Sequence, residues 1–321
     1  MTTLISKGRA RWLRDLPSRA ALALLNERRL RLWLGKRHEA ALQRHAPDLP
    51  DLDPLGNHIV ETLNSKGVCI TNLDDLRIPG AHDVVESAWR LSSDFAPQAR
   101  TLAKGGQQFI IVPPAEIVRH PQIFRLGLHE RLLDIVESYL GLPAAYDGAA
   151  INYTVADGLE IATRKWHRDR EDRRMLKVAV YLHDVDDEGG PFECIARKDP
   201  VRNDIDGYHY EFGYDAMLKQ RLGADYANDL TSCTGRKGTV VFCDTARFFH
   251  RGKPPTGRDR AAIFYSYFAN PPRHPFLCER SGISRDEALG MIEGLSFRQR
   301  RAALWRREVP PIMRLIPSAS V

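Results

Sequence analysis

The sequence predicts a mainly β core with flanking helices, of the β-sandwich or jelly-roll class. Two observations predict this class. From about residue 145 to residue 270, short segments rich in β-branched and aromatic residues alternate with Gly, Asp and Pro turns, as in sandwiches and jelly rolls. The segments on either side have helical patterns instead. The chain of 321 residues is 43% hydrophobic, which is enough apolar material for a sizeable core.

The strands of this core are expected at short apolar runs between turn residues. They are residues 149–155, 177–185, 192–195, 208–212, 238–244 and 261–268. Two further strands are expected before the core, at residues 68–71 after a Gly turn and at 107–114, where two prolines close the run. The core therefore begins only after a largely helical first half.

Helices are expected on both sides of the core. Residues 17–45 are rich in Ala, Leu and Arg and predict one helix, with Asp15 and Pro17 suited to its start. Residues 46–56 are rich in Pro and Asp and predict a linker. Further helices are expected at 55–66, 80–95 and 120–141. After the core, the sequences at 284–287 and 296–299 predict capping boxes at two helix starts.

The positive charge of the chain is concentrated at its beginning. The net charge is +6, yet the first 50 residues alone carry eleven Lys or Arg against four acids. Residues 1–45 therefore form a basic, apolar-faced segment that could lie on an anionic membrane surface or dock on a partner. The alternative is a helix that packs on its own domain with a solvated Arg face. No nucleic-acid partner is expected, because no basic stripe with interleaved aromatics follows.

The sequence favours a cytoplasmic location. No apolar run approaches the roughly 18–20 residues that span a bilayer, and the first residues lack the apolar stretch and cleavage site of a signal peptide. The five cysteines are far apart, form no CxxC pair and predict neither a disulfide framework nor a zinc finger. A peripheral position at the inner face of the membrane is the alternative that the basic segment leaves open.

A candidate metal site begins in the stretch KWHRDRED. In an extended strand, residues i and i+2 lie on the same face, so His167 and Asp169 can point an imidazole and a carboxylate at one ion. A facial iron triad requires a second histidine, and His250 is the candidate, at the end of an apolar strand. Arg260 follows ten residues later and could hold a carboxylate, because a guanidinium binds carboxylates bidentately and stays charged.

These residues carry a family resemblance. His167-x-Asp169, the distal His250, Arg260 and the Gly-Pro turn within 178–195 resemble the Fe(II)/2-oxoglutarate oxygenases, most closely the phytanoyl-CoA dioxygenase-like family. The resemblance covers about residues 58–270. It implies a double-stranded β-helix of the jelly-roll, cupin-like type within an oxygenase domain at 51–275. Residues 1–50 then form a basic helical extension, and residues 276–321 form a helical C-terminal extension.

The resemblance also implies the chemistry. Fe(II), held by His167, Asp169 and His250, would use 2-oxoglutarate and O2 to hydroxylate an aliphatic C–H of a small molecule, with release of succinate and CO2. Arg260 would hold the distal carboxylate of 2-oxoglutarate. The intact Asp169 indicates oxidation rather than the halogenation of relatives with a small residue there. The chain departs from the family at 196–200, where many relatives have Gly-Ser-His, and at Ala262, where many have Ser.

Other residues near these motifs are ambiguous. Asn152 and Tyr153, on the strand before the motif, could contact the cosubstrate or could be ladder positions, and Lys177 and Tyr181 are similar cases on the next strand. Our interpretation adds Asn152 and Tyr181 to the cofactor-binding residues. Trp166 is expected to pack away from the site.

Some polar residues are expected to lie outside the metal site. His209 and Glu211 form another His-x-carboxylate pair, but no His and Arg follow them at the right distance. His183 and the adjacent Asp184 are expected to be structural or on the surface. Arg258 competes with Arg260 for the carboxylate role and lies in a turn, whereas Arg260 opens an apolar strand.

The substrate is only weakly constrained by the sequence. Residues 164–177 carry seven Lys or Arg against three acids, and such a rim would attract an anionic substrate. Together with the basic first segment, it favours a membrane-borne anion such as a lipid-linked saccharide. The alternative for the rim is a solvated hairpin. A second function class also stays open, namely a jelly-roll binding or scaffold protein with a non-catalytic metal site.

Overall fold

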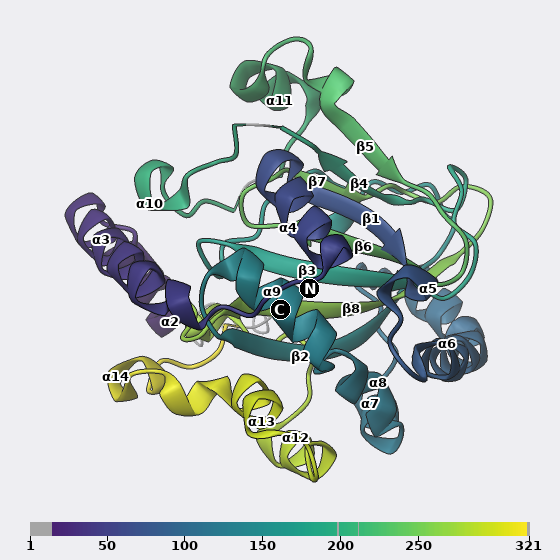
Figure 1. The fold of residues 1–321 in the computed structure, drawn as a ribbon. Coiled ribbons are helices and arrows are strands. Elements are labelled where there is room, and N and C mark those ends of the chain that lie inside the picture. Colours follow the sequence, from purple (N-terminus) through teal and green to yellow (C-terminus); the bar gives the residue numbers. More distant parts are fainter. Residues whose placement is uncertain (1–14, 198, 211, 320–321) are drawn as a thin grey trace, which may run out of the picture.

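Two antiparallel sheets form the centre of the computed structural model, which describes residues 15–197, 199–210 and 212–319 (Figure 1). The larger sheet has the order β1-β6-β3-β8-β2, and the smaller has the order β5-β4-β7. The strands are β1 (Val68–Asn72), β2 (Ala144–Thr154), β3 (Met175–Tyr181), β4 (Phe192–Ile195), β5 (Leu230–Cys233), β6 (Thr239–Asp244), β7 (His250–Gly252) and β8 (Arg260–Ala269). The predicted β core with flanking helices is therefore confirmed.

Helices precede the sheets, lie between their strands and follow them. The α-helices are α2 (Leu16–Leu25), α3 (Arg28–His45), α4 (Pro54–Lys66), α5 (Leu73–Leu76), α6 (Ala81–Lys104), α7 (Pro114–Arg119), α8 (Pro121–Leu126), α9 (Glu130–Leu140), α10 (Asn203–Asp206), α11 (Asp215–Leu222), α12 (Arg285–Met291), α13 (Phe297–Ala303) and α14 (Pro311–Arg314). The 3-10 turns are η1 (Ala46–Asp48), η2 (Ala162–Arg164), η3 (Tyr226–Asp229), η4 (Pro275–Leu277) and η5 (Trp305–Glu308). In Figure 1, α12, α13 and α14 lie together beside β2.

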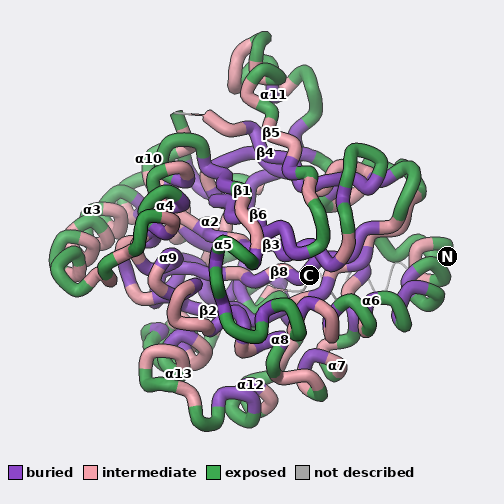
Figure 2. The backbone as a smooth tube through the Cα atoms, turned by 45° about the vertical axis from the view of Figure 1, so that its right-hand side comes forward, coloured by how far each residue is buried: buried purple, intermediate pink, exposed green. Residues whose placement is uncertain are grey.

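The large sheet buries both of its faces, and the alternation of side chains explains how. On β8, Ile263, Tyr265 and Tyr267 join the apolar cluster that the helices cover. Ala262 and the half-buried Phe264 point to the other face and join a second cluster between the two sheets. Figure 2 shows the resulting burial along the strands, with the exposed stretches on outer helices such as α6 and α11. The face between the sheets is where the polar site described below opens.

Several predicted elements differ in the structure. The single helix expected at 17–45 is two helices, because Glu27 leaves helical geometry and its carboxylate accepts the Leu30 N–H as the cap of α3. The helix expected at 120–141 is likewise divided into α8 and α9. Gly127, between them, packs so closely that an added Cβ would lie 2.5 Å from the Tyr146 hydroxyl.

Two expected strands do not form, and two others were not expected. Residues 107–114 run beside β2 with a single bridge, Ile111 to Asn152, because the prolines end the run at once. The described residues of 208–212 form no strand. The strands β5 and β7 were missed, because one is largely polar and the other has only three residues. Both capping boxes, at Ser284 and Ser296, are confirmed.

Two further sequence predictions concern the cysteines and membrane-spanning helices. All five cysteines are buried and carry free thiols. Within the part of the chain that the structure describes, no helix combines the length and the apolar character that crossing a membrane requires.

Candidate metal centre

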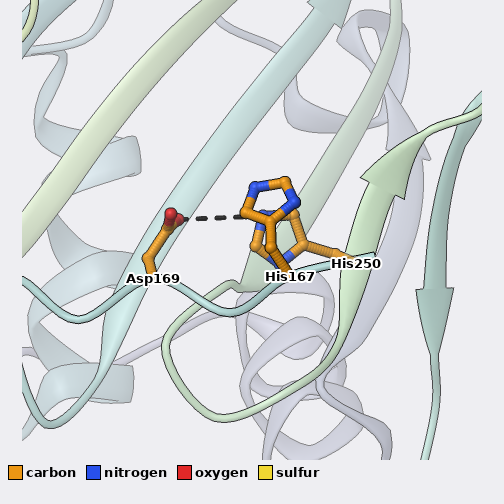
Figure 3. A group of neighbouring side chains, drawn as sticks. All are labelled: His167, Asp169 and His250. Carbon is orange, nitrogen blue, oxygen red and sulfur yellow. Dashed lines mark ion pairs between the residues drawn. The ribbon is translucent and has the colours of Figure 1, made fainter. Parts of the chain in front are cut away.

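Three buried side chains meet between the two sheets (Figure 3). His167 and Asp169 lie on an extended segment before β3, and His250 begins β7. The two histidines are fixed side by side by a pair of backbone hydrogen bonds, each N–H donating to the other residue's carbonyl at 3.0 Å. One ligand atom from each of the three residues lies within 4.8 Å of the others. The structure therefore brings the three predicted ligands together.

Backbone contacts orient both imidazole rings. The Nδ1 atom of His167 lies 2.8 Å from the Lys165 carbonyl, and the Nδ1 atom of His250 lies 3.2 Å from the Phe248 carbonyl. Because a carbonyl can only accept, each Nδ1 carries the proton and each Nε2 is left with a lone pair for a metal. Phe192 stacks on the His250 ring at a centroid distance of 5.6 Å. The Nδ1-protonated tautomer of both histidines is the form that lets Nε2 bind a metal.

The protonation states also suit a cation. Burial lowers the pKa of His167 and lowers the pKa of His250 further, so both rings are neutral near pH 7. Burial alone would raise the pKa of Asp169, but Lys177 and the two histidines hold that pKa below its ordinary value. The site thus offers two neutral imidazoles and one carboxylate, the state in which these groups bind metals.

Lys177 is the partner of the candidate carboxylate ligand. Its Nζ donates to Asp169 Oδ2 at 2.6 Å from strand β3. The same carboxylate oxygen lies 3.7 Å from His250 Nε2, the pair joined by the dashed line in Figure 3. Lys177 was only one of several ambiguous residues in the sequence, and the structure places it directly against the candidate ligand.

A cavity of about 140 Å³ opens onto the triad. Its walls include residues of β2, β3, β7 and β8, together with Gln108, Phe109 and Ile110 from the segment beside β2. At one end lie Arg260, Thr154 and Asn152, where β2 and β8 pair. At the other end lie Asp147 and Arg280. The candidate metal centre therefore sits in a cavity with two chemically different ends.

Arg260 is a buried cation in the wall of this cavity. Its Nη1 donates to the Gly190 carbonyl, and its Nη2 donates to the Thr154 hydroxyl at 3.3 Å. Among the residues that the structure describes, it makes no ion pair with a carboxylate. Gly252 admits the guanidinium, because a Cβ there would lie 2.5 Å from Arg260 Nη2. Burial lowers the pKa of Arg260, and an anion in the cavity would offset that burial.

The other two predicted cofactor-binding residues lie in different surroundings. Asn152 lines the cavity, and its buried Oδ1 has no hydrogen-bond partner within the described chain. Tyr181 is buried between the two sheets, outside the cavity lining. Its hydroxyl donates to the Cys233 carbonyl at 2.6 Å and accepts the Phe192 N–H at 3.0 Å. Asn152 is therefore available to a ligand, whereas the Tyr181 hydroxyl is already engaged.

The residues expected to lie outside the metal site do so where they are described. His183 lies just beyond the end of β3, and its Nε2 accepts the Ala261 N–H of β8 at 2.9 Å, so the ring has a structural role. Arg258 is exposed and pairs with Asp186. His209 lies outside the cavity lining, although its neighbour Tyr210 lines the cavity, and Glu211 lies outside the described residues. Trp166 packs under Arg251 with a cation–ring distance of 4.6 Å.

The basic stretch 164–177 is neither a solvated hairpin nor a rim of unpaired charge. Arg168 is buried and donates to Asn203 and to the Ala246 carbonyl, and Arg173 pairs with Asp204 at 2.9 Å. Of the seven Lys and Arg side chains in this stretch, only Arg164 and Lys177 line the cavity. Most of its cations therefore serve the fold, which removes much of the expected attraction for an anion.

Sequence reasoning missed several residues of the cavity wall. Arg280 comes from the segment before α12 and pairs with the buried Glu171 at 2.7 Å. Asp147, on β2, accepts the backbone N–H groups of Glu279 and Arg280, and burial raises the pKa of Asp147 to about 7. No local pattern signals these residues, because the fold joins segments more than 100 positions apart.

Comparison with known proteins finds similarity at the level of structure only. No protein-family model and no curated protein sequence matches the chain. Solved structures that resemble it include EctD from S. alaskensis in its apo form. The two sequences are 18% identical, the match covers 70% of this chain and 79% of EctD, and the TM-score is 0.46.

Two further structures illustrate the range of these matches. HygX from Streptomyces hygroscopicus, solved with nickel and 2-oxoglutarate, is 16% identical to this chain. The match covers 68% of this chain and 90% of HygX, with a TM-score of 0.43. The non-haem α-ketoglutarate-dependent epimerase SnoN from nogalamycin biosynthesis has 14% identity, 68% and 84% coverage and a TM-score of 0.41. At these values, the roles of residues in this chain depend on its own geometry.

Proposed function

We propose that the protein is a non-haem Fe(II)/2-oxoglutarate-dependent dioxygenase of the phytanoyl-CoA dioxygenase-like type, built on a double-stranded β-helix. The reaction is hydroxylation of an aliphatic C–H of a small molecule. One observation carries this proposal: a buried His-Asp-His group and a buried arginine without a carboxylate partner in the described chain share one cavity. We assign the oxygenase domain to 51–275, with helical extensions at 1–50 and 276–321.

The donor set fits a facial iron site. Two imidazoles and one carboxylate occupy one side of an ion and leave the other positions open. When bound, Fe(II) with 2-oxoglutarate and O2 supplies the oxidising chemistry, which releases succinate and CO2. His167, Asp169 and His250 would hold the ion, and the backbone contacts at Nδ1 of the two histidines leave their Nε2 atoms free to bind it.

Arg260 supports the role of 2-oxoglutarate as cosubstrate. Among the described residues, the buried Arg260 guanidinium donates only to a carbonyl and a hydroxyl, so it can also bind a carboxylate bidentately. The neighbouring Asn152 has an unpartnered amide oxygen in the same end of the cavity. These two residues would hold the cosubstrate, while Tyr181 would act at a distance by supporting the Phe192 backbone beside His250.

Lys177 would position the carboxylate ligand. Its 2.6 Å contact fixes one oxygen of Asp169 and favours the charged form of that carboxylate. Second contacts of this kind orient metal ligands and affect metal affinity. The apolar walls formed by Phe192 and Phe264 would limit the access of water to the open positions.

For the substrate, we propose an anionic small molecule, with a lipid-linked saccharide as one example. The cavity lining supports this choice, because it carries four cations, Arg164, Lys177, Arg260 and Arg280, against two acids, Asp147 and Asp169. We also propose a cytoplasmic location with peripheral contact to the inner face of the membrane through residues 1–45. The described part of that segment exposes Leu24 at 65% and Trp33 at 52% of their surfaces, with Arg37 stacked on Trp33.

Anaerobic addition of Fe(II) and 2-oxoglutarate to the purified protein tests the proposal. A weak visible charge-transfer band should appear, and it should vanish in His167→Ala. The matched control is His209→Ala, an exposed histidine outside the cavity, which should keep the band. Absence of the band in the wild-type protein would defeat the proposal.

A further inference from the structure

A second cavity of about 260 Å³ lies beside the metal cavity, between β2 and the C-terminal helices. The two cavities share three wall residues, Asp147, Gly148 and Ser281. The shared wall is where β2 has a register irregularity between Tyr146 and Ala149. The second cavity is therefore next to the end of the metal cavity that lies away from Arg260.

Within the shared wall, Gly148 and the Ser281 side chain are in close contact. Gly148 has a positive φ of 96°, which favours glycine. A Cβ at this position would lie 2.7 Å from the Ser281 hydroxyl oxygen and would collide with it. The backbone of β2 and the Ser281 side chain thus approach more closely than any larger residue at position 148 would permit.

The floor and the rim of the second cavity differ in character. The floor includes the buried side chains of Phe124, Tyr146 and Trp305. The rim includes Arg285, Arg307 and Arg314, which are exposed. Throughout residues 15–197, 199–210 and 212–319, none of these three arginines has a carboxylate partner within ion-pair distance.

Neither acid in this cavity wall neutralises the rim. The Asp147 carboxylate accepts the backbone N–H groups of Glu279 and Arg280. Glu279 lines the cavity, but its carboxylate lies 2.8 Å from Arg306 Nη1, so its charge is already offset. Three further guanidinium groups remain around one apolar pocket. Arginine binds phosphate bidentately, and several arginines favour a doubly charged group over a single carboxylate. The combination is suited to a molecule with a phosphate group attached to an apolar segment.

We propose that the second cavity binds the phosphate-bearing end of an amphiphilic substrate, whose carbon to be oxidised lies in the metal cavity beyond Gly148 and Ser281. This inference rests on the proposed function of the metal centre and specifies the substrate class of that centre. The apolar segment packs on Phe124, Tyr146 and Trp305, and the arginines of the rim hold the phosphate. The oxidised carbon is therefore distant from the phosphate in the substrate.

Calorimetric titration of the metal-free protein with octyl phosphate tests the binding half of the proposal. Octyl phosphate should bind, inorganic phosphate should bind at least tenfold more weakly, and the neutral octyl glucoside should not bind. The double variant Arg285→Gln/Arg307→Gln should lose at least tenfold in affinity for octyl phosphate. The control Arg77→Gln/Arg236→Gln removes two exposed arginines outside both cavities and should change the affinity less than twofold.

A variant that fills the second cavity distinguishes the contribution of the cavity's shape to binding from that of its charge. Ala303→Phe places a ring in the second cavity without removing charge, and it should also abolish binding of octyl phosphate. Equal affinity of the arginine variant and the wild type, or binding of octyl glucoside as tight as that of octyl phosphate, would overturn the proposal.

The connection to the metal centre is tested separately. Octyl phosphate should shift the charge-transfer band of the wild-type protein with Fe(II) and 2-oxoglutarate, but not that of Arg285→Gln/Arg307→Gln. Tight binding that leaves the wild-type band unchanged would show an independent site and overturn the proposed link. If the band itself does not form, the proposed function fails, whereas the calorimetric result still reports on the second cavity.

Discussion

The metal centre and the second cavity share a wall but are built in opposite ways. At the metal centre, His167, Asp169 and His250 are buried. Backbone carbonyls orient the two imidazoles, and Lys177 holds the Asp169 carboxylate. In the second cavity, exposed arginines without acidic partners in the described chain surround an apolar floor. Chemistry on a bound metal requires fixed ligands, whereas recognition of an anion requires unpaired charge. On the function that we propose, the fixed side chains would serve the metal and the exposed arginines would serve recognition of the substrate.

The largest effect is expected from a substitution that removes metal binding and leaves the second cavity intact. His250→Ala removes one of three ligands and should reduce bound Fe(II) to background, as measured by metal analysis after desalting. His183→Ala should retain iron, because within the described residues that ring hydrogen-bonds to backbone groups at the end of β3, outside the cavity. Binding of octyl phosphate should survive in both variants. Retention of stoichiometric iron by the His250 variant would contradict the assigned triad.

A second experiment separates the two kinds of arginine. Arg260→Gln should weaken the binding of 2-oxoglutarate by about 10–100-fold, because a charged hydrogen-bonded pair contributes about 1.5–3 kcal/mol. The band with Fe(II), titrated against 2-oxoglutarate, measures this change. Arg258→Gln is the control, since that arginine is exposed and pairs with Asp186 outside the cavity. Similar weakening in both variants would argue against a cosubstrate contact at Arg260.

A smaller effect is expected at the residue that positions the carboxylate ligand. Lys177→Met removes the 2.6 Å contact with Asp169 while keeping much of the side-chain volume. Iron affinity should fall by about tenfold, because contacts behind the ligands typically contribute this much. Competition against a colorimetric chelator measures the affinity, and Lys177→Arg should restore part of it. Unchanged affinity in Lys177→Met would remove Lys177 from the site.

The smallest expected effect concerns the shared wall and its pH dependence. The pKa of Asp147 is about 7 in the folded protein, above the value of 3.8 for an unperturbed Asp, because it is buried. The folded state therefore binds an extra proton between about pH 4 and pH 7, and the stability linked to Asp147 is lost as pH rises through 7. Asp147→Asn lacks this titration.

The free energy of unfolding measures this difference. In urea titrations, the free energy of unfolding of Asp147→Asn, relative to that of the wild type, should increase from pH 5 to pH 8. Both proteins experience the same effects from the other carboxylates, so the comparison isolates position 147. A relative stability that is constant over this range would show that Asp147 titrates well below pH 7.

Part of the metal end was accessible to sequence reasoning. His167 and Asp169 are two positions apart, and His250 ends an apolar run, so spacing and residue type predicted the group of side chains that the structure brings together. Arg260 was distinguishable from Arg258 because it opens a buried strand. The β core was predictable because short runs rich in β-branched and aromatic residues, such as residues 261–268, are separated by turn residues.

The rest depends on long-range contacts. Tyr181 shares a face of β3 with Lys177, but Phe192 and Cys233 cover it where the two sheets meet, and alternation alone does not show where a cavity ends. Arg280 reaches the cavity from a segment more than 100 positions beyond Asp147. The division of the predicted helix 17–45 depends on a single capping contact at Glu27. Such features follow from packing rather than from spacing.

The central claim is that the triad and Arg260 support oxygen-dependent turnover of 2-oxoglutarate. The most direct measurement is succinate release by the purified protein with Fe(II), 2-oxoglutarate and a cell extract as the source of substrate, with and without O2. We expect succinate only with O2, and none from His167→Ala under the same conditions. Iron binding without succinate from the wild-type protein would contradict the claim and favour a binding or scaffold protein with a non-catalytic metal site.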